Sequence, residues 1–183
     1  MNIYHLIYKM MIVTNLFIKL LHIVINKGEN DMAELLTNED YLFLGARVKP
    51  LLLSTETGGN FSVFEFIEVK GLEAPFHIHE NEDEIWRIVE GEITFFLEEQ
   101  EIHAVAGDTI FVPRGKSHTF KLKTNTVKAI LSLTSTDFEN VIRDIARPVT
   151  SATELPNQPV SKKQAEQLIA SGKKNGLTIL KHE

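Results

Sequence analysis

Cysteine is absent from this chain of 183 residues, which excludes disulfide bonds, thiol catalysis and cysteine-ligated zinc. Any metal must therefore be held by histidine, aspartate or glutamate. The absence of cysteine also agrees with a reducing cytoplasm, which is the location we expect. Long runs of lysine or arginine are missing too, and the formal net charge is -6. We therefore expect no nucleic-acid partner, and a small molecule is the better candidate.

Residues 1–31 differ in composition from the rest of the chain. The first 26 residues contain no alanine, glycine, proline, serine, arginine, glutamine or acidic residue. The apolar run from Met10 to Ile25 spans 16 residues, which is too short to cross a bilayer, and no small-residue cleavage site follows it.

Translated spacer DNA explains this composition. Most of these residues have A/T-rich codons, and the Lys-Gly-Glu just before Met32 fits the purine-rich sequence of a bacterial ribosome-binding site. We interpret residues 1–31 as a mis-assigned leader and expect the natural protein to start at Met32. The alternative is a helix that lies on a membrane surface, and only then would a membrane be a partner.

Short strands separated by turns dominate residues 41–134. Apolar and β-branched residues recur there in short runs, and glycine, proline or acidic residues separate the runs. This spacing predicts an all-β sandwich or barrel over residues 36–134, and the absence of an internal repeat favours one barrel over two. The clearest predicted strands are residues 61–69, 84–91, 92–99, 100–107, 108–115, 117–123 and 127–133.

The pattern changes after Leu133, and a helical extension is predicted over residues 135–183. Asp137 can cap a helix whose apolar residues share one face and which ends near Pro148. A second short helix follows a linker and begins with a capping box of Ser161 and Gln164. We expect both short helices to pack against the barrel rather than to read DNA.

Two histidines one residue apart form the first candidate site. Alternate side chains of an extended strand share a face, so His77 and His79 point together. Glu84 begins the next strand, and the intervening loop can bring its carboxylate beside the two imidazoles. Two nitrogens and one oxygen suit Mn, Fe, Co, Ni, Cu or Zn. The alternative is a surface strand on which two solvated histidines lie near acidic residues.

A third histidine strengthens the metal interpretation. Gly107, Pro113 and Gly115 shape a strand and a tight turn ahead of His118. Apolar residues alternate with polar ones after it, which places His118 on the inward face of its strand. A histidine that points inward among apolar neighbours usually has a partner.

Together these positions resemble the two motifs of the cupin superfamily, Gly-x5-His-x-His-x(3,4)-Glu-x6-Gly and Gly-x5-Pro-x-Gly-x2-His-x3-Asn. The two matches are separated by 15 residues. Nine fixed positions at the correct spacing arise by chance at a given start less than about once in a billion. Only the final asparagine is missing, where this chain has Leu122. The matching residues are Gly71, His77, His79, Glu84 and Gly91, followed by Gly107, Pro113, Gly115 and His118.

The resemblance implies a single jelly-roll barrel, or double-stranded β-helix, which binds one divalent transition metal through His77, His79, Glu84 and His118. The segments "TGGNFSVFEF" and "DEIWRIVEGEITFF" are similar to small single-barrel relatives of quercetin 2,3-dioxygenase. This similarity implies a metal-dependent dioxygenase that acts on a small apolar or aromatic enol, phenol or keto substrate, with Glu84 also as the catalytic proton acceptor. It implies a homodimer as well.

Two other functions stay open at this point. One is a cupin that binds a small molecule without turnover, as a regulatory protein would. The other is a sugar-type isomerase that uses zinc as a Lewis acid. An isomerase of phosphorylated sugars needs convergent lysine and arginine, whereas these strands supply mainly Phe, Ile, Val and Trp, which favours an apolar substrate.

The remaining aromatic and basic residues have predicted structural roles. Trp86 lines the pocket or belongs to the core, and His103 is expected on a strand face rather than at a metal. Arg47 and Arg87 are more often exposed strand charges than anion contacts. The phenylalanines expected to fill the barrel are Phe64, Phe66, Phe95, Phe111 and Phe120, and the histidines without an expected role, near the chain ends, are His5, His22 and His182.

Overall fold

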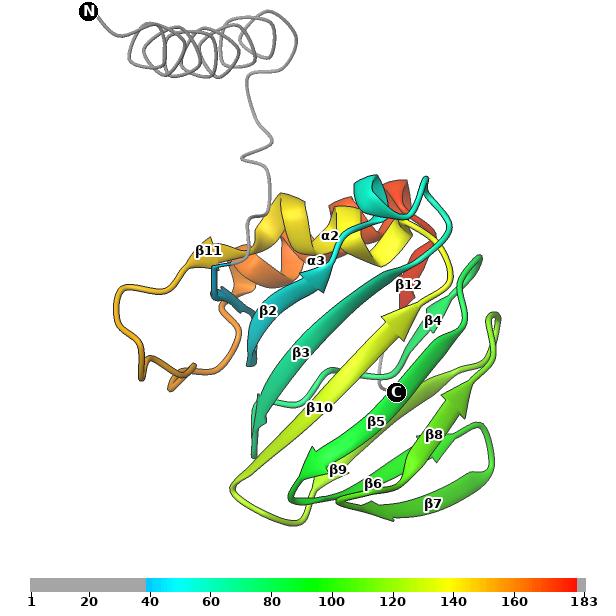
Figure 1. Cartoon of the computed structure of the whole chain (residues 1–183), viewed down its shortest axis with the longest axis vertical. Coiled ribbons are helices and arrows are strands. Elements are labelled where there is room, and N and C mark those ends of the chain that lie inside the picture. Colours follow the sequence, from blue (N-terminus) through cyan, green and yellow to red (C-terminus); the bar gives the residue numbers. More distant parts are fainter. Residues whose placement is uncertain (1–38, 181–183) are drawn as a thin grey trace, which may run out of the picture. The chain divides into compact units, whose positions relative to one another are not determined.

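The computed structural model describes residues 39–180, which form two antiparallel sheets and two α-helices (Figure 1). The interpretation of residues 1–31 as a leader, and the predicted start of the barrel at residue 36, lie outside the described residues. Within the described range, neither helix has the length and hydropathy needed to cross a bilayer.

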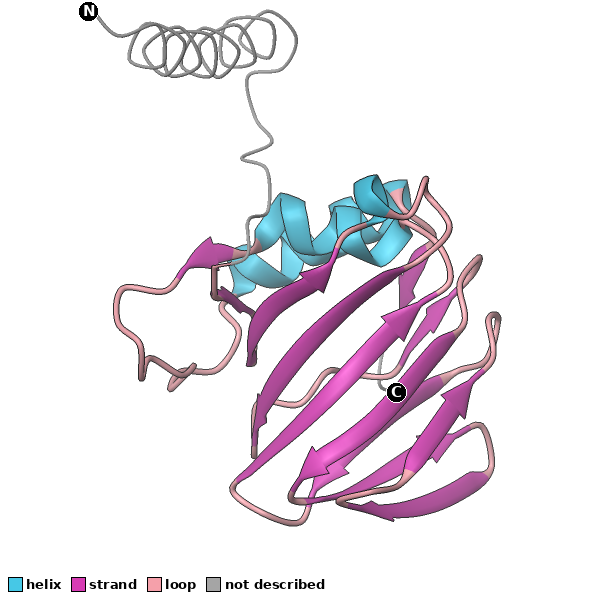
Figure 2. Ribbon diagram, in the orientation of Figure 1, coloured by secondary structure: helices cyan, strands magenta, loops and turns pink. Residues whose placement is uncertain are grey.

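The two sheets face each other as the halves of a jelly roll (Figure 2), which confirms the predicted all-β fold with short helices. The larger sheet has the strand order β11-β1-β2-β3-β10-β5-β8, and the smaller has the order β12-β4-β9-β6-β7. The strands are β1 Tyr41–Phe43, β2 Ala46–Leu52, β3 Ser62–Val69, β4 His77–His79, β5 Glu84–Glu90, β6 Glu92–Leu97, β7 Gln100–Val105, β8 Thr109–Val112, β9 His118–Leu122, β10 Thr126–Leu133, β11 Arg147–Pro148 and β12 Leu177–Ile179.

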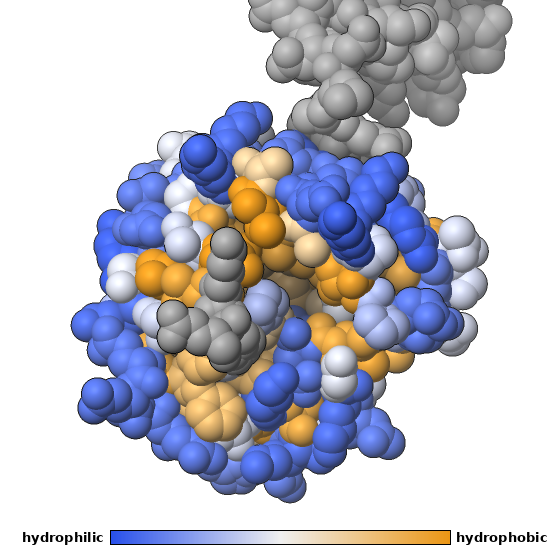
Figure 3. Space-filling model, turned by 180° about the vertical axis from the view of Figure 1, so that it is seen from behind, coloured by the Kyte–Doolittle hydropathy of each residue, from blue (hydrophilic) through white to orange (hydrophobic). Residues whose placement is uncertain are grey.

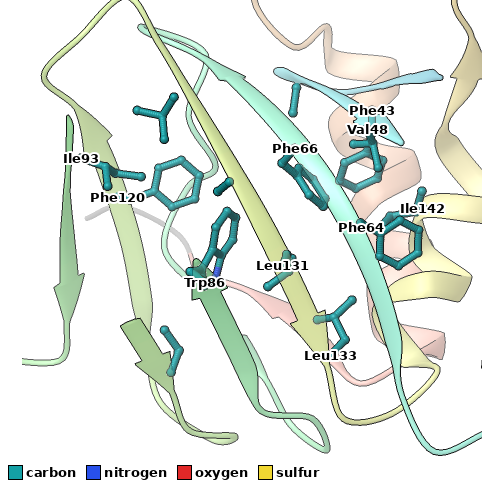
Figure 4. Close-up of a cluster of buried hydrophobic side chains, with 14 of the residues drawn as sticks. Phe43, Val48, Phe64, Phe66, Trp86, Ile93, Phe120, Leu131, Leu133 and Ile142 are labelled. Carbon is teal, nitrogen blue, oxygen red and sulfur yellow. The ribbon is translucent and has the colours of Figure 1, made fainter. Parts of the chain in front are cut away.

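Alternation along the strands creates the core between the sheets. On β3, the side chains of Ser62, Phe64, Phe66 and Glu68 are buried, whereas the intervening residues are partly exposed. Phe66, Trp86 and Phe120 are among the buried residues drawn in Figure 4, and their rings follow one another at centroid distances of 5.9 and 5.5 Å. Burial of each such ring stabilises the fold by roughly 1.5–3 kcal/mol.

The prediction that Phe111 fills the barrel is wrong. Ile110 and Val112 of β8 are buried, so the strand parity turns Phe111 outward, where its side chain is 55% exposed. It lies opposite Ile85 of β5, which is 38% exposed on the same outer face. The other four phenylalanines predicted for the core are buried, namely Phe64, Phe66, Phe95 and Phe120.

The two α-helices occupy the predicted region, with one corrected cap. Helix α2 spans Asp137–Ile145 and its N-cap is Thr136, so Asp137 is its first residue rather than its cap. The Asp137 carboxylate instead accepts a hydrogen bond of 2.8 Å from Nδ2 of Asn81. Helix α3 spans Lys162–Lys174 and begins with the predicted capping box. The backbone amide of Ser161 donates to Oε1 of Gln164 at 3.0 Å, and the backbone amide of Gln164 donates to Oγ of Ser161 at 3.3 Å. A short 3-10 helix, η1, spans Ser54–Glu56.

The C-terminal segment also adds strands that its sequence pattern did not predict. Strand β11 pairs with β1, and β12 pairs with β4 so that Leu177 lies opposite His79 and Ile179 opposite His77. The backbone amide of Leu180 donates to the carbonyl of Phe76 at 2.9 Å. The strand that carries the two histidines is therefore held from the C-terminal end of the chain as well as by the barrel.

One glycine of the first sequence motif is required by the turn in which the chain passes from β5 of the larger sheet to β6 of the smaller sheet. Gly91 has a φ of 88°, a backbone conformation that favours glycine. A Cβ atom there would lie 2.6 Å from Oγ1 of Thr124 and 2.6 Å from the carbonyl oxygen of Thr126. The conformation and the close approach exclude a side chain, so glycine at this position lets the chain cross between the sheets against the segment from Thr124 to Thr126.

Candidate metal centre

Four predicted ligands meet inside the barrel. His77 and His79 come from β4, His118 begins β9, and Glu84 begins β5. All four side chains are buried, and one ligand atom from each lies within 4.8 Å of all the others. His77 is paired with His118 across the smaller sheet, whereas Glu84 belongs to the larger sheet. The cluster therefore bridges the two sheets.

The turns that carry the two motifs are pinned to each other. The backbone amide of Gly115 donates to the carbonyl of His79 at 2.7 Å. The guanidinium of Arg114 donates from Nε and Nη2 to the carboxylate of Asp83 at 3.1 and 2.9 Å, and the Arg114 backbone amide donates to it at 2.8 Å. Since Asp83 immediately precedes Glu84, these bonds tie the turn before His118 to the start of β5.

Each imidazole is oriented by a hydrogen bond at Nδ1. Nδ1 of His77 lies 2.8 Å from the carbonyl of Pro75, and Nδ1 of His118 lies 3.0 Å from the carbonyl of Lys116. Nδ1 of His79 lies 3.3 Å from Oε2 of Glu82. Carbonyl and carboxylate oxygens accept, so in each ring Nδ1 carries the proton and Nε2 offers its lone pair to the cluster.

The atoms that face the centre fit a metal ion. Within residues 39–180, Nε2 of His118 lies 2.8 Å from Oε2 of Glu84 and Nε2 of His79 lies 3.5 Å from Oε1 of Glu84, but with the ring protons on Nδ1 these buried atoms are all acceptors and no hydrogen bond joins them. Leaving such atoms unsatisfied costs about 1–3 kcal/mol each. A divalent transition metal shared by three nitrogens and one carboxylate satisfies all of them at once, and this donor set suits several such metals.

The electrostatics of His77 and Glu84 favour the protonation states that a metal requires, whereas the carboxylates beside His79 favour a proton that the metal must displace. Burial, helped by the neighbouring His118 and His79, lowers the pKa of His77 to about 3. Burial would raise the pKa of Glu84, but the three imidazoles outweigh it and hold that pKa well below its usual value. Burial lowers the pKa of His79, yet Glu84 and Glu82 overcome it and raise that pKa. His77 is thus neutral and Glu84 is a carboxylate.

Glu82 is a site residue that the sequence analysis missed. Its side chain is 1% exposed, and besides the contact with His79 its Oε2 accepts a hydrogen bond of 2.7 Å from the backbone amide of Phe138 in α2. The ring of Phe138 packs edge-on against His79 at a centroid distance of 4.9 Å. Nothing in the sequence pattern distinguishes Glu82 from the other acidic residues of its loop.

A cavity of about 600 Å³ adjoins the cluster, and His77 and Glu84 are part of its lining. Aromatic and aliphatic side chains make up most of the wall, including Trp86 and Phe120. Figure 3 shows apolar side chains around a hollow on the face turned away in Figure 1. Trp86 therefore takes both predicted roles, because it is buried in the core and also lines the cavity. The polar residues of the lining, beyond the cluster, are Glu68, Glu73, Thr119 and Lys121.

The other predicted candidates lie apart from the cluster. Nε2 of His103 lies 4.0 Å from a carboxylate oxygen of Glu92, and both side chains are about half exposed. Arg47 pairs with Asp40, and Arg87 donates to Thr109 at 3.1 Å. Neither arginine lines the cavity beside the cluster. His5, His22 and His182 lie outside the described residues.

Comparison with known proteins gives one family match and one curated relative. The family model described as a cupin domain matches residues 63–134. Quercetin 2,3-dioxygenase of Bacillus subtilis (strain 168) is 30% identical over 125 residues, which are 68% of this chain and 35% of that protein. The chain therefore spans about a third of the length of this relative.

Two of the solved structures that are similar to this chain have lower sequence identity. KdgF from Halomonas sp. is 18% identical, with 60% of this chain and 99% of that chain covered and a TM-score of 0.47. An RmlC-like cupin from Shewanella frigidimarina NCIMB 400 is 19% identical, with 58% and 92% covered and a TM-score of 0.47.

Proposed function

The chain belongs to the cupin superfamily, and from this premise we propose that it is a metal-dependent dioxygenase for a small apolar or aromatic enol, phenol or keto substrate. One observation carries the proposal: a buried cluster of three histidines and a glutamate opens into a cavity of about 600 Å³ with a mainly apolar wall. That volume suits a small organic molecule, for which pockets of roughly 300–1,000 Å³ are usual. The match to a quercetin 2,3-dioxygenase supports a flavonol-like substrate.

The ligands of the ion would be His77, His79, Glu84 and His118, and the ion is one divalent transition metal. When bound, such a metal supplies a Lewis acid that lowers the pKa of a substrate hydroxyl and favours reaction with O₂. The ionised Glu84 lines the cavity, so its carboxylate is available to accept the proton of that hydroxyl.

The walls of the cavity would position the substrate. Trp86, Phe96 and Phe120 line it and offer ring faces and edges against which a planar aromatic molecule can pack. The apolar lining also keeps water away from the reacting carbon. Among residues 39–180, Lys121 is the one lysine or arginine in the lining, and it lies 3.7 Å from the carboxylate of Glu73. This charge pattern does not favour a phosphorylated sugar.

Oxygen uptake tests the proposal. The full chain is loaded separately with iron, manganese, nickel, cobalt, copper or zinc, and an oxygen electrode follows its reaction with flavonols and diketones. We expect uptake that matches substrate loss, and Glu84→Gln should reduce the rate by at least about 100-fold at equal metal content. The matched control is Glu80→Gln, an exposed carboxylate in the preceding loop that should leave the rate unchanged.

Two results would replace the proposal. Tight substrate binding without oxygen uptake, with every metal, would support the cupin that binds a small molecule without turnover. Interconversion of sugars by the zinc form alone would support the isomerase.

The expected homodimer also remains a proposal. Support comes from the outer face of β5 and β8, where Ile85 and Phe111 lie opposite each other and are both exposed. Light scattering coupled to size exclusion should give twice the mass of one chain, and a mass of one chain at all concentrations would contradict it.

A further inference from the structure

Glu68 is a buried carboxyl group in the same cavity that the proposed metal chemistry does not use. Its side chain is 5% exposed, points to the core side of β3 and lines the cavity. Among residues 39–180, no side chain or backbone group forms a hydrogen bond or an ion pair with its carboxyl. Its oxygens are not among the fully buried unpartnered atoms of the described residues, so they are reachable from the cavity, where a ligand can bind them.

In the part of the chain that the structure describes, no cation acts on Glu68 to hold it as a carboxylate. Across the larger sheet it lies opposite Ala46 of β2 and Val127 of β10, which are both buried and apolar. The charged group that acts on it is Glu73, which also lines the cavity. Burial and then the charge of Glu73 raise the pKa of Glu68 to about 8. At neutral pH the carboxyl therefore keeps its proton and can donate a hydrogen bond.

Glu73 differs from Glu68 because its charge is stabilised. Its two oxygens accept hydrogen bonds from the backbone amides of Gly71 at 3.0 Å and Leu122 at 3.1 Å. Despite partial burial, these bonds and Lys121 hold the pKa of Glu73 below its usual value. This end of the cavity therefore presents one hydrogen-bond donor beside one fixed negative charge.

We propose that Glu68 is a specificity residue, whose carboxyl group donates a hydrogen bond to an uncharged oxygen at the end of the substrate remote from the metal. A substrate with an anionic group at that end would be rejected, because it would meet Glu68 and the negative charge of Glu73 without a free cation. The inference rests on the proposed function for its substrate class, and it names the substituent that this class should carry.

The position of Glu68 along the barrel sets the length of that substrate. On β10, Leu133 lies opposite Glu84 and Val127 lies opposite Glu68. Six residues of extended strand separate these two positions, which is about 20 Å. The two glutamates therefore lie toward opposite ends of the cavity, and a molecule that contacts both side chains must be longer than a small diketone.

Ligand binding without turnover tests the inference. The metal-loaded full chain is titrated in the absence of O₂ with three flavonols that carry hydrogen, hydroxyl or carboxylate at the far end of the phenyl ring. Quenching of Trp86 gives the affinity, since this single tryptophan lines the cavity. We expect the hydroxyl compound to bind about tenfold more tightly than the hydrogen compound, and the carboxylate compound to bind most weakly.

Variants of Glu68 separate hydrogen bonding from packing. Glu68→Gln keeps a donor and should preserve the preference for the hydroxyl compound, whereas Glu68→Leu should abolish it. Glu68→Leu should also melt at the wild-type temperature or higher, because it removes an unpaired polar group, and a purely structural role would give the opposite result. The matched control is Glu65→Gln on the outer side of the same strand, where the carboxylate pairs with Lys128 at 2.9 Å.

Several outcomes would overturn the inference: equal affinity for all three flavonols, no binding of any of them, or a hydroxyl preference that survives in Glu68→Leu. Failure of the proposed function gives a different result. The predicted order of affinities without any oxygen uptake in air would refute the dioxygenase and leave the role of Glu68 in place.

Discussion

Two glutamates in one cavity take opposite protonation states although they are buried to almost the same extent. Glu84 is 1% exposed and Glu68 is 5% exposed. Three imidazoles surround Glu84 and keep it ionised, whereas Glu68 faces apolar neighbours and the negative Glu73, which keep it protonated. Burial raises the pKa of the carboxyl group at both positions, and only the imidazoles around Glu84 reverse that effect.

The two ends of the cavity also differ in how firmly their polar groups are held. At the cluster, every histidine has an orienting contact at Nδ1, and Glu82 extends that support to helix α2. At the other end, Glu68 has no such contact among the described residues. The first arrangement suits an ion that needs fixed ligands, and the second suits a substrate that arrives and leaves.

The largest expected effect comes from removal of a ligand at the firmly held end. His118→Ala should lose most of the metal that the wild type binds, because the remaining three groups no longer surround it. Elemental analysis after purification without chelators should give about one metal per wild-type chain. His103→Ala is the matched control, since His103 is exposed and distant from the cluster in the fold. Wild-type protein that stays metal-free after supplementation with transition metals would refute the metal centre.

A smaller effect is expected when the support of a ligand is removed instead. Glu82→Gln leaves all four ligands in place but weakens the acceptor at Nδ1 of His79, so metal affinity should fall by about 10–100-fold. Competition with a chromophoric chelator measures this loss. Glu80→Gln removes the same charge from the same loop, where the Glu80 carboxylate accepts from Thr178 at 2.9 Å, and should change the affinity little. An equal loss in both variants would mean that loop charge matters rather than orientation.

The sequence predicts the metal ligands much better than the other polar residues of the cavity. His77, His79, Glu84 and His118 occupy spaced motif positions, and strand alternation alone places the two histidines of β4 on one face. Glu82 lies in a loop without periodicity, so nothing in the pattern separates its inward side chain from Glu80 or Asp83. It is recognisable after the fold brings the amide of Phe138 to it.

Strand parity limits the rest of the prediction. In residues 61–69, both faces of the strand carry a glutamate and apolar residues, so the pattern does not decide whether Glu65 or Glu68 is buried. Residues 110–112 are all apolar, so the pattern does not decide which face Phe111 occupies either. In the structure Phe111 lies on the exposed face, contrary to the prediction. Strand β12 is only three residues long and pairs with β4, nearly a hundred residues earlier, and such pairing leaves no local signal.

The pH dependence of the free energy of unfolding tests the elevated pKa of Glu68. Glu68 binds its proton more tightly in the folded chain, where its pKa is about 8, than in the unfolded chain, where the usual value is 4.5. Between these values the unfolded state releases the proton first, so stability falls as pH rises, by at most on the order of 5 kcal/mol. Urea unfolding at about pH 5 and about pH 9 measures the loss, which Glu68→Gln should lack. A wild type and a variant with the same pH dependence would contradict the elevated pKa.

The smallest effect separates the two causes of that elevated pKa. Glu73→Gln removes the negative charge beside Glu68 but leaves the burial of Glu68 unchanged. Burial is the larger cause, so the pH range in which stability is lost should move downward and still end above the ordinary value of 4.5. Glu73→Gln also weakens one of the two hydrogen bonds that the side chain of residue 73 accepts from backbone amides. That loss lowers the free energy of unfolding by a similar amount at every pH, so it does not move the pH range in which stability is lost. A range that fell to the ordinary value would show that the charge of Glu73, and not burial, raises the pKa of Glu68.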